Sequence, residues 1–132
     1  MVGETNLQKL IRSMSAELVS GLFVFSTVAE QDVPQGIRPR MIFQEAEGIT
    51  LVLFKEDADA CGLTYEFPCR MITLNVHSSL DAVGFLGRIT EALAKENMGV
   101  NPVSGFYHDH LFVPDGKEQD ALDVLRRLAS QA

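Results

Sequence analysis

The apolar positions change their spacing several times along the chain, and each change predicts a new element. Leu7, Leu10 and Met14 recur at the spacing of a helix face, whereas alternating apolar residues are typical of a half-buried strand. Pro34, Gly36 and Pro39 indicate a surface loop. In order, the first half is predicted to hold a helix near residues 7–14, a strand at 22–28, the loop at 30–40, a hairpin of 41–46 and 49–54, a short helix from about residue 56 to Gly62, and a short extra strand at 63–67.

The second half has a clearer pattern. Ile72, Leu74 and Val76 alternate with polar residues and predict a strand at residues 70–77. A helix at 81–97, a strand at 100–107, its hairpin partner at 111–113 and a final helix at 117–129 follow. Pro102 lacks an N–H, so its strand is expected at a sheet edge. The resulting order, β-α-β-β-α, is typical of a ferredoxin-like unit.

A weak internal repeat indicates that the chain holds two such units. The segment from Leu51 resembles the segment from Leu111 after a two-residue insertion, at an offset of about 60 residues. We therefore predict an α+β protein of two fused ferredoxin-like halves, residues 1–66 and 67–132, with largely antiparallel sheets packed on helices. The first half lacks an obvious opening strand, so one continuous α+β domain is the alternative.

Composition narrows the function classes. The 132 residues are 46% hydrophobic and 22% charged, which is typical of a folded globular protein. A net charge of −7 and no basic stripe disfavour binding to nucleic acid. Because no apolar run approaches the ~20 residues of a membrane span, and residues 1–10 carry no signal core, we expect a cytoplasmic protein without membrane contact.

The two cysteines do not form a metal or redox motif. Cys61 and Cys69 are eight residues apart, and neither lies in a CxxC pair. In a reducing compartment no disulfide is expected, and we interpret both as small buried residues.

No glycine-rich phosphate loop is present either, so no cofactor is expected.

The topology brings the polar residues of the second half to one rim of the sheet. In a βαββ unit, the loop after the first strand and the turn between the second and third strands lie at the same end. Here these segments are residues 77–81 and 107–110, and the first and third strands are neighbours. His77 and His110 should therefore be close, and all three histidines, with His108, should gather at this rim.

Three interpretations of the rim remain open. In the structural one, Ser78 or Ser79 caps the helix and Asp81 lies favourably in its first turn. In the second, the helix N-terminus, the serines and the histidines bind a small molecule with a carboxylate. In the third, the three histidines hold a metal with Asp81 or Asp109, although His-x-His across a turn is a weak signal. Catalysis has less support, because no Gly-x-Ser-x-Gly elbow accompanies the serines.

Four segments carry a family resemblance. They are GETNLQKL from Gly3, GITLVL from Gly48, TLNVHSSLDAVG from Thr73 and GFYHDHLFVP from Gly105. These segments resemble a family of short, stand-alone bacterial proteins made of two ACT-like domains. The resemblance spans nearly the whole chain and is most specific in HSSL and YHDHLFV.

The resemblance implies a ferredoxin-like fold and a regulatory role. ACT domains bind amino acids or similar effectors with the loop after the first strand and the start of the next helix. Combined with the rim, this gives the candidate ligand-binding residues His77, Ser78, Ser79, Leu80, Asp81, Gly84, His108, Asp109 and His110. Many ACT domains place Pro before the helix glycine, but Val83 stands here, so the ligand's identity does not follow.

The leading hypothesis is a non-catalytic regulatory protein that binds a small amino-acid-like effector and forms a homodimer. The edge strand at residues 100–107 supports pairing. One alternative is a protein-interaction module that regulates a separate enzyme in trans. A metal-dependent enzyme built on the histidine rim is the other.

Overall fold

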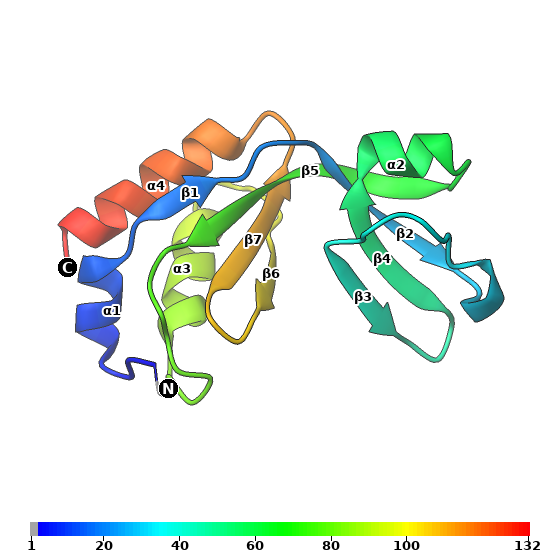
Figure 1. The fold of residues 1–132 in the computed structure, drawn as a ribbon. Helices are drawn as coiled ribbons and strands as arrows, with labels where there is room; N and C mark the ends of the chain where they lie inside the picture. The colour runs from blue at the N-terminus through cyan, green and yellow to red at the C-terminus, as the bar shows by residue number, and fades with distance from the viewer. Residues whose placement is uncertain (1–2) are drawn as a thin grey trace. The chain divides into compact units, whose positions relative to one another are not determined.

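The chain forms two compact units, seen in a computed structural model that describes residues 3–132 (Figure 1). The inserted unit is Gly21–Cys69, and the split unit combines Met1–Ser20 with Arg70–Ala132. The sequence predicts a division after residue 66, close to where the chain passes between the units. The structure groups residues 1–20 differently, because they pack with the second half rather than the first. No helix within residues 3–132 is long and apolar enough to cross a membrane.

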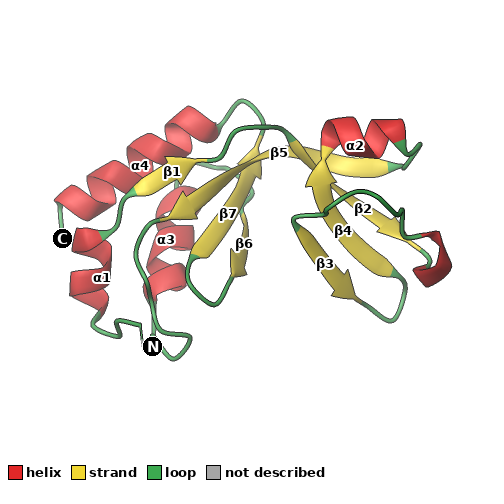
Figure 2. Cartoon of the chain, in the orientation of Figure 1, coloured by secondary structure: helices red, strands yellow, loops and turns green. Residues whose placement is uncertain are grey.

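The inserted unit has the strand arrangement of a ferredoxin-like fold. Its elements are β2 Phe23–Val28, β3 Met41–Gln44, β4 Ile49–Phe54, α2 Lys55–Ala60 and the first part of β5 Tyr65–Leu74. The strands lie in the order β3-β4-β2-β5. A loop with the 3-10 turn η1 Glu30–Asp32 replaces the helix expected between β2 and β3 (Figure 2). This unit supplies its own opening strand, β2.

Alternation along these strands divides the sheet of the inserted unit into two faces. Val24, Leu51 and Leu53 are fully or almost fully buried and pack with Ala58 of α2. Val33 and Ile37 of the loop at residues 29–40 also pack on this cluster. The loop therefore covers apolar surface that a helix covers in a regular unit.

The split unit completes the same fold with a strand from the N-terminus. Its elements are α1 Leu7–Ser13, β1 Ala16–Leu18, the second part of β5, α3 Phe85–Ala94, β6 Asn101–Ser104, β7 Asp109–Pro114 and α4 Glu118–Ser130. The strands lie in the order β1-β5-β7-β6. β1 is antiparallel to β5, with Glu17 opposite Thr73, and occupies the place of the fourth strand.

The apolar face of α1 explains why the N-terminal segment belongs to the split unit. Leu10 and Ile11 are fully buried and join a core with Ile72, Leu111 and Leu125. Each buried side chain of this size contributes roughly 1.5–3 kcal/mol. Because α1 contacts both α3 and α4, removing it would uncover the centre of this core.

Three local predictions need correction. Residues 63–67 and 70–77 do not form separate strands, because Tyr65–Leu74 is one continuous strand. The third helix begins at Phe85 rather than near Asp81, because Gly84 before it has a φ of 89°, a left-handed conformation that excludes helix. Cys61 is exposed while Cys69 is buried, because Cys61 follows α2 on the surface. Pro102 does lie in an edge strand, β6.

Candidate functional site

A pocket of about 250 Å³ lies where the loop after β5 meets the start of α3. Residues 75–84 form this loop, and its left-handed Gly84 turns the chain into the helix. The end of β6 and the start of β7 close the opposite side. The pocket is lined by Ser78, Ser79, Leu80, Ala82, Gly84, Phe85, Leu86, Gly87, Ser104, Gly105 and Asp109.

Asp109 is the charged group of this pocket and is only 5% exposed. The Ser78 hydroxyl donates a hydrogen bond of 2.9 Å to its carboxylate. The internal repeat aligns Asp109 with Ile49, a buried residue at the start of β4. Strands β4 and β7 share the same alternation of burial. A carboxylate thus replaces an aliphatic side chain at a core position, and its burial is costly unless hydrogen bonds or an opposite charge compensate it.

The N-terminus of α3 faces the same pocket. The first N–H groups of a helix have no partner within the helix and attract negative charge. Gly84 at the cap offers no side-chain hydrogen bond to them, and Phe85, Leu86 and Gly87 of the first turn line the pocket. One pocket therefore combines a buried carboxylate with the positive end of a helix.

The N-terminal segment pairs with the loop that carries the serines. The N–H of Glu4 donates to the carbonyl of His77, and the N–H of Ser79 donates to the carbonyl of Glu4, each at 2.9 Å. A Cβ on Gly3 would lie 2.6 Å from the Ser79 nitrogen, closer than such atoms approach. Only glycine allows this approach, so Gly3 and Glu4 hold Ser78 and Ser79 in place.

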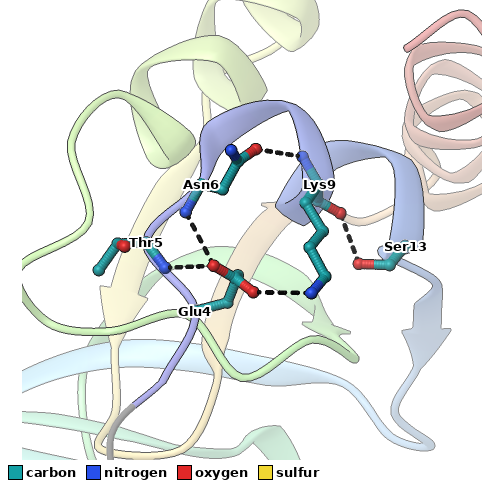
Figure 3. Close-up of polar contacts among 5 residues, drawn as sticks. All are labelled: Glu4, Thr5, Asn6, Lys9 and Ser13. Carbon is teal, nitrogen blue, oxygen red and sulfur yellow. Dashed lines mark hydrogen bonds and ion pairs between the residues drawn. The ribbon is translucent and has the colours of Figure 1, made fainter.

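Glu4 also anchors the start of α1 (Figure 3). Its carboxylate accepts hydrogen bonds from the N–H groups of Thr5 and Asn6, at 3.0 and 3.1 Å, and lies 3.2 Å from the Lys9 ammonium. The N–H of Asn6 is the largest of these influences, and together they lower the pKa of Glu4. The Asn6 side chain caps the helix by accepting from the N–H of Lys9.

The ring neighbours of His77 differ from those of His108 and His110. The His77 ring lies 6.4 Å from the Phe106 ring and 5.8 Å from the Tyr107 ring, between centroids. His110 Nδ1 is 3.0 Å from the Thr73 hydroxyl. The rings of His108 and His110 are 6.4 Å apart. Within residues 3–132, no group of three or more His, Cys, Asp or Glu side chains is placed to hold a metal, so the metal interpretation gains no support.

The pocket gathers only part of the predicted site. Ser78, Ser79, Leu80, Gly84 and Asp109 line it, while His77, Asp81, His108 and His110 do not. The Asp81 N–H donates to Ser79 Oγ at 3.1 Å and stabilises the loop. Sequence reasoning did not find Gly3 and Glu4, because pairing between segments more than 70 residues apart leaves no local pattern. Ser104 and Gly105 were within reach, since they precede the predicted turn.

Comparisons with known proteins agree with this architecture. Models of the ACT domain match residues 2–70 and 66–127. A Vibrio cholerae protein of unknown function, described as a possible transport protein, is 41% identical with a TM-score of 0.84, covering 93% of this chain and 95% of that chain. No curated protein sequence matched.

More distant structures share the fold. The ligand-free regulatory subunit of aspartate kinase from Thermus thermophilus has a TM-score of 0.67 at 12% identity, covering 86% of this chain and 95% of its own. An Agrobacterium tumefaciens protein has a TM-score of 0.71 at 16% identity, covering 88% and 89%.

Fold and comparisons together define the class as a tandem of two ferredoxin-like α+β domains. The chain belongs to the ACT domain family. Its architecture resembles that of aspartate kinase regulatory domains.

Proposed function

We propose that this protein is a non-catalytic regulator that binds a small amino-acid-like effector in the pocket at the start of α3. The observation that carries the proposal is the pairing of opposite electrostatic groups around that pocket. Asp109 would accept the ammonium group of the effector, and the first N–H groups of α3 would bind its carboxylate. A free amino acid carries both groups, at the separation of a single carbon.

The size of the pocket supports a ligand of this class. Its volume of about 250 Å³ lies just below the ~300–1,000 Å³ typical of pockets for drug-sized ligands. Leu80 and Leu86 provide apolar surface for a side chain, and the hydroxyls of Ser79 and Ser104 provide further hydrogen-bonding groups. A role for the histidines in binding stays a prediction.

A thermal-shift screen with each common amino acid, followed by calorimetric titration, tests the proposal. At least one amino acid should raise the unfolding temperature in proportion to its concentration. Asp109→Asn removes the charge while keeping the shape and the Ser78 contact, and should weaken binding of that amino acid at least tenfold. Glu56→Gln, a change at an exposed position of α2, is the matched control and should leave binding unchanged. Absence of any stabilising amino acid would contradict the proposal.

The proposal includes a homodimer, which the edge strand β6 supports. In the order β1-β5-β7-β6, β6 lies at the end of the sheet, where unpaired backbone groups favour pairing with another strand. Phe106 and Tyr107, in the turn that follows β6, are both exposed. Light scattering should give twice the chain mass, and replacing both exposed aromatic residues, Phe106→Ser with Tyr107→Ser, should reduce it toward the monomer. A monomeric wild type at high concentration would argue against the dimer and leave effector binding untouched.

A further inference from the structure

One sheet face of the inserted unit is rich in aromatic side chains and lies opposite the core with α2. Strand pairing places Val52 between Phe25 and Met41, and Thr50 between Thr27 and Phe43. Phe43 is 62% exposed. An exposed aromatic surface of this kind indicates a binding site more often than chance.

At one end, this face already binds a cation of the chain itself. Phe23 and Phe54 stack with ring centroids 4.6 Å apart. The guanidinium of Arg40 lies over both rings, 5.0 Å from the centroid of Phe23 and 5.7 Å from that of Phe54. The backbone N–H of Arg40 donates a hydrogen bond of 2.6 Å to the carbonyl of Val52, which fixes Arg40 at the sheet. The aromatic rings of this face therefore already contact one positive charge, that of Arg40.

Next to this pair lies an open groove of about 580 Å³. Phe25, Met41 and Phe43 supply its apolar walls, and the carboxylates of Glu45 and Glu66 supply negative charge at its margins. Thr50 donates its hydroxyl to Glu45, which holds that carboxylate at the groove. None of the described residues that line the groove is basic, and Arg40 is not among them.

We propose that this groove binds a small organic cation, an ammonium or guanidinium group carried on an apolar or aromatic body. Aromatic faces and carboxylates both attract a positive charge, while Met41 and the phenyl rings cover the apolar body. The same charges disfavour an anion. The groove lies in the inserted unit and does not depend on the amino-acid pocket, so this ligand is distinct from the proposed effector.

NMR titration of the full chain with three matched probes tests the proposal. Phenethylammonium carries the charge, 2-phenylethanol is its neutral analogue, and 3-phenylpropionate is anionic. At low salt, phenethylammonium should bind about fivefold more tightly than the alcohol, as one or two cation–aromatic contacts provide, and 3-phenylpropionate more weakly than either. The largest shifts should appear at Phe25, Phe43 and Thr50.

Three variants separate the contributions. Phe43→Ser should weaken binding of both ligands, and of the cation more than the alcohol, because it removes an apolar wall together with one aromatic face. Glu66→Gln should lower the preference for the cation over the alcohol about threefold. Glu47→Gln removes the same charge from the adjacent hairpin turn, outside the groove lining, and should leave that preference unchanged.

Three results would overturn the proposal. Equal binding of the cation and the alcohol would remove the charge recognition. An equal loss of preference in Glu47→Gln and Glu66→Gln would show attraction to the net charge of −7 alone. Shifts at Phe25 and Phe43 with a basic peptide, but with none of the three small probes, would assign the groove to a protein partner instead.

Discussion

The two units share one fold, yet they differ at the place where the split unit has its pocket. In the split unit, β5 leads through a loop of residues 75–84 into the helix α3. In the inserted unit, β2 leads through the loop at residues 29–40 directly to β3, without an α-helix. The inserted unit therefore has no helix N-terminus at the place where the split unit has its pocket. The two units thus have the same strand order, and the connection after the first strand of each unit is what differs.

The hairpin turns show the same contrast at equivalent positions. Glu45 and Gly105 begin these turns, and the N–H of each donates to a carbonyl three residues later. The split unit carries Phe106 and Tyr107 in its turn, whereas the inserted unit carries Ala46 and Glu47. The backbone is conserved between the units while its chemistry has diverged. The two turns therefore share a backbone hydrogen bond and differ in the chemistry of their side chains.

Placing at the start of β4 the residue type that begins β7 should have the largest effect on stability. Ile49→Asp places a carboxylate at a position that is 8% exposed and packs with Leu51 and Leu53. Unlike Asp109, it has no equivalent of the Ser78 hydroxyl. A buried charge without a partner costs roughly 3–5 kcal/mol, so chemical denaturation should show a loss of this size in the free energy of unfolding.

Ile49→Leu is the control for this exchange, because it changes shape without adding charge. It should cost no more than about 1.5 kcal/mol. If Ile49→Asp were as stable as Ile49→Leu near neutral pH, the position would tolerate charge in both units. The buried Asp109 would then carry no functional argument.

The reverse exchange, Asp109→Ile, should abolish effector binding while the protein stays folded. The variant gives β7 the apolar start that β4 already has, and leaves Ser78 without its acceptor. Loss of a buried charge contact typically costs about 2–5 kcal/mol in binding, or at least thirtyfold in affinity. Calorimetric titration with the amino acid that raises the unfolding temperature most is the measurement. Retained affinity in this variant would place the ammonium group elsewhere.

Most of the strands could be predicted from the sequence, because their signals are local, but the short strand β1 was not predicted and β5 was predicted as two separate strands. The alternation of Ile72 and Leu74 and the proline at residue 102 correctly predicted the strand type and the edge position. The offset of about 60 residues aligned β4 with β7, each of which is the second strand from its edge in the strand order. Hydrophobic periodicity and turn residues were enough for these results.

The association of residues 1–20 with the second half could not be predicted in the same way. Nothing local to Leu10 or Ile11 indicates which core they join, since any apolar core would bury them equally well. The left-handed conformation of Gly84 likewise depends on the turn into α3. The spacing of apolar residues continues through Gly84, so the sequence predicts a helix that starts too early. For the site, the rim was predicted from topology, but the separation of Asp109 from the histidines depends on side-chain directions that periodicity does not specify.

A Cβ at Gly3 should loosen the loop that carries Ser78 and Ser79. Gly3→Ala cannot keep the approach to the Ser79 backbone, so the two hydrogen bonds made by Glu4 with this loop should be lost. At about 1 kcal/mol each, hydrogen exchange of the Ser79 amide should accelerate about tenfold or more. Gly99→Ala, where the added atom meets open space, should leave that amide unchanged. If the Ser79 amide of Gly3→Ala exchanged as slowly as that of the wild type, the loop would not need its contacts with Gly3 and Glu4.

The smallest expected effect concerns the charge of Glu4, and acid should remove it. The lowered pKa of Glu4 means that its ionised form stabilises the folded state. The contribution is therefore complete above the ordinary value of 4.5 and is lost as pH falls through the lower folded-state value. Glu4→Gln should slightly reduce protection of the Ser79 amide at neutral pH, by less than Gly3→Ala does, and should match the wild type in acid.

Asp59 makes this last experiment specific to one unit. The Lys55 ammonium and the Tyr65 hydroxyl lower the pKa of Asp59 through hydrogen bonds of 2.8 Å each, so it has the same acid response as Glu4 but lies in the inserted unit. Asp59→Asn should therefore leave the Ser79 amide unchanged at every pH, because the hydrogen-bond partners of Asp59 are Lys55 and Tyr65 of its own unit. If both variants changed that amide equally, the carboxylates would act through global stability, and Glu4 would have no particular hold on the loop.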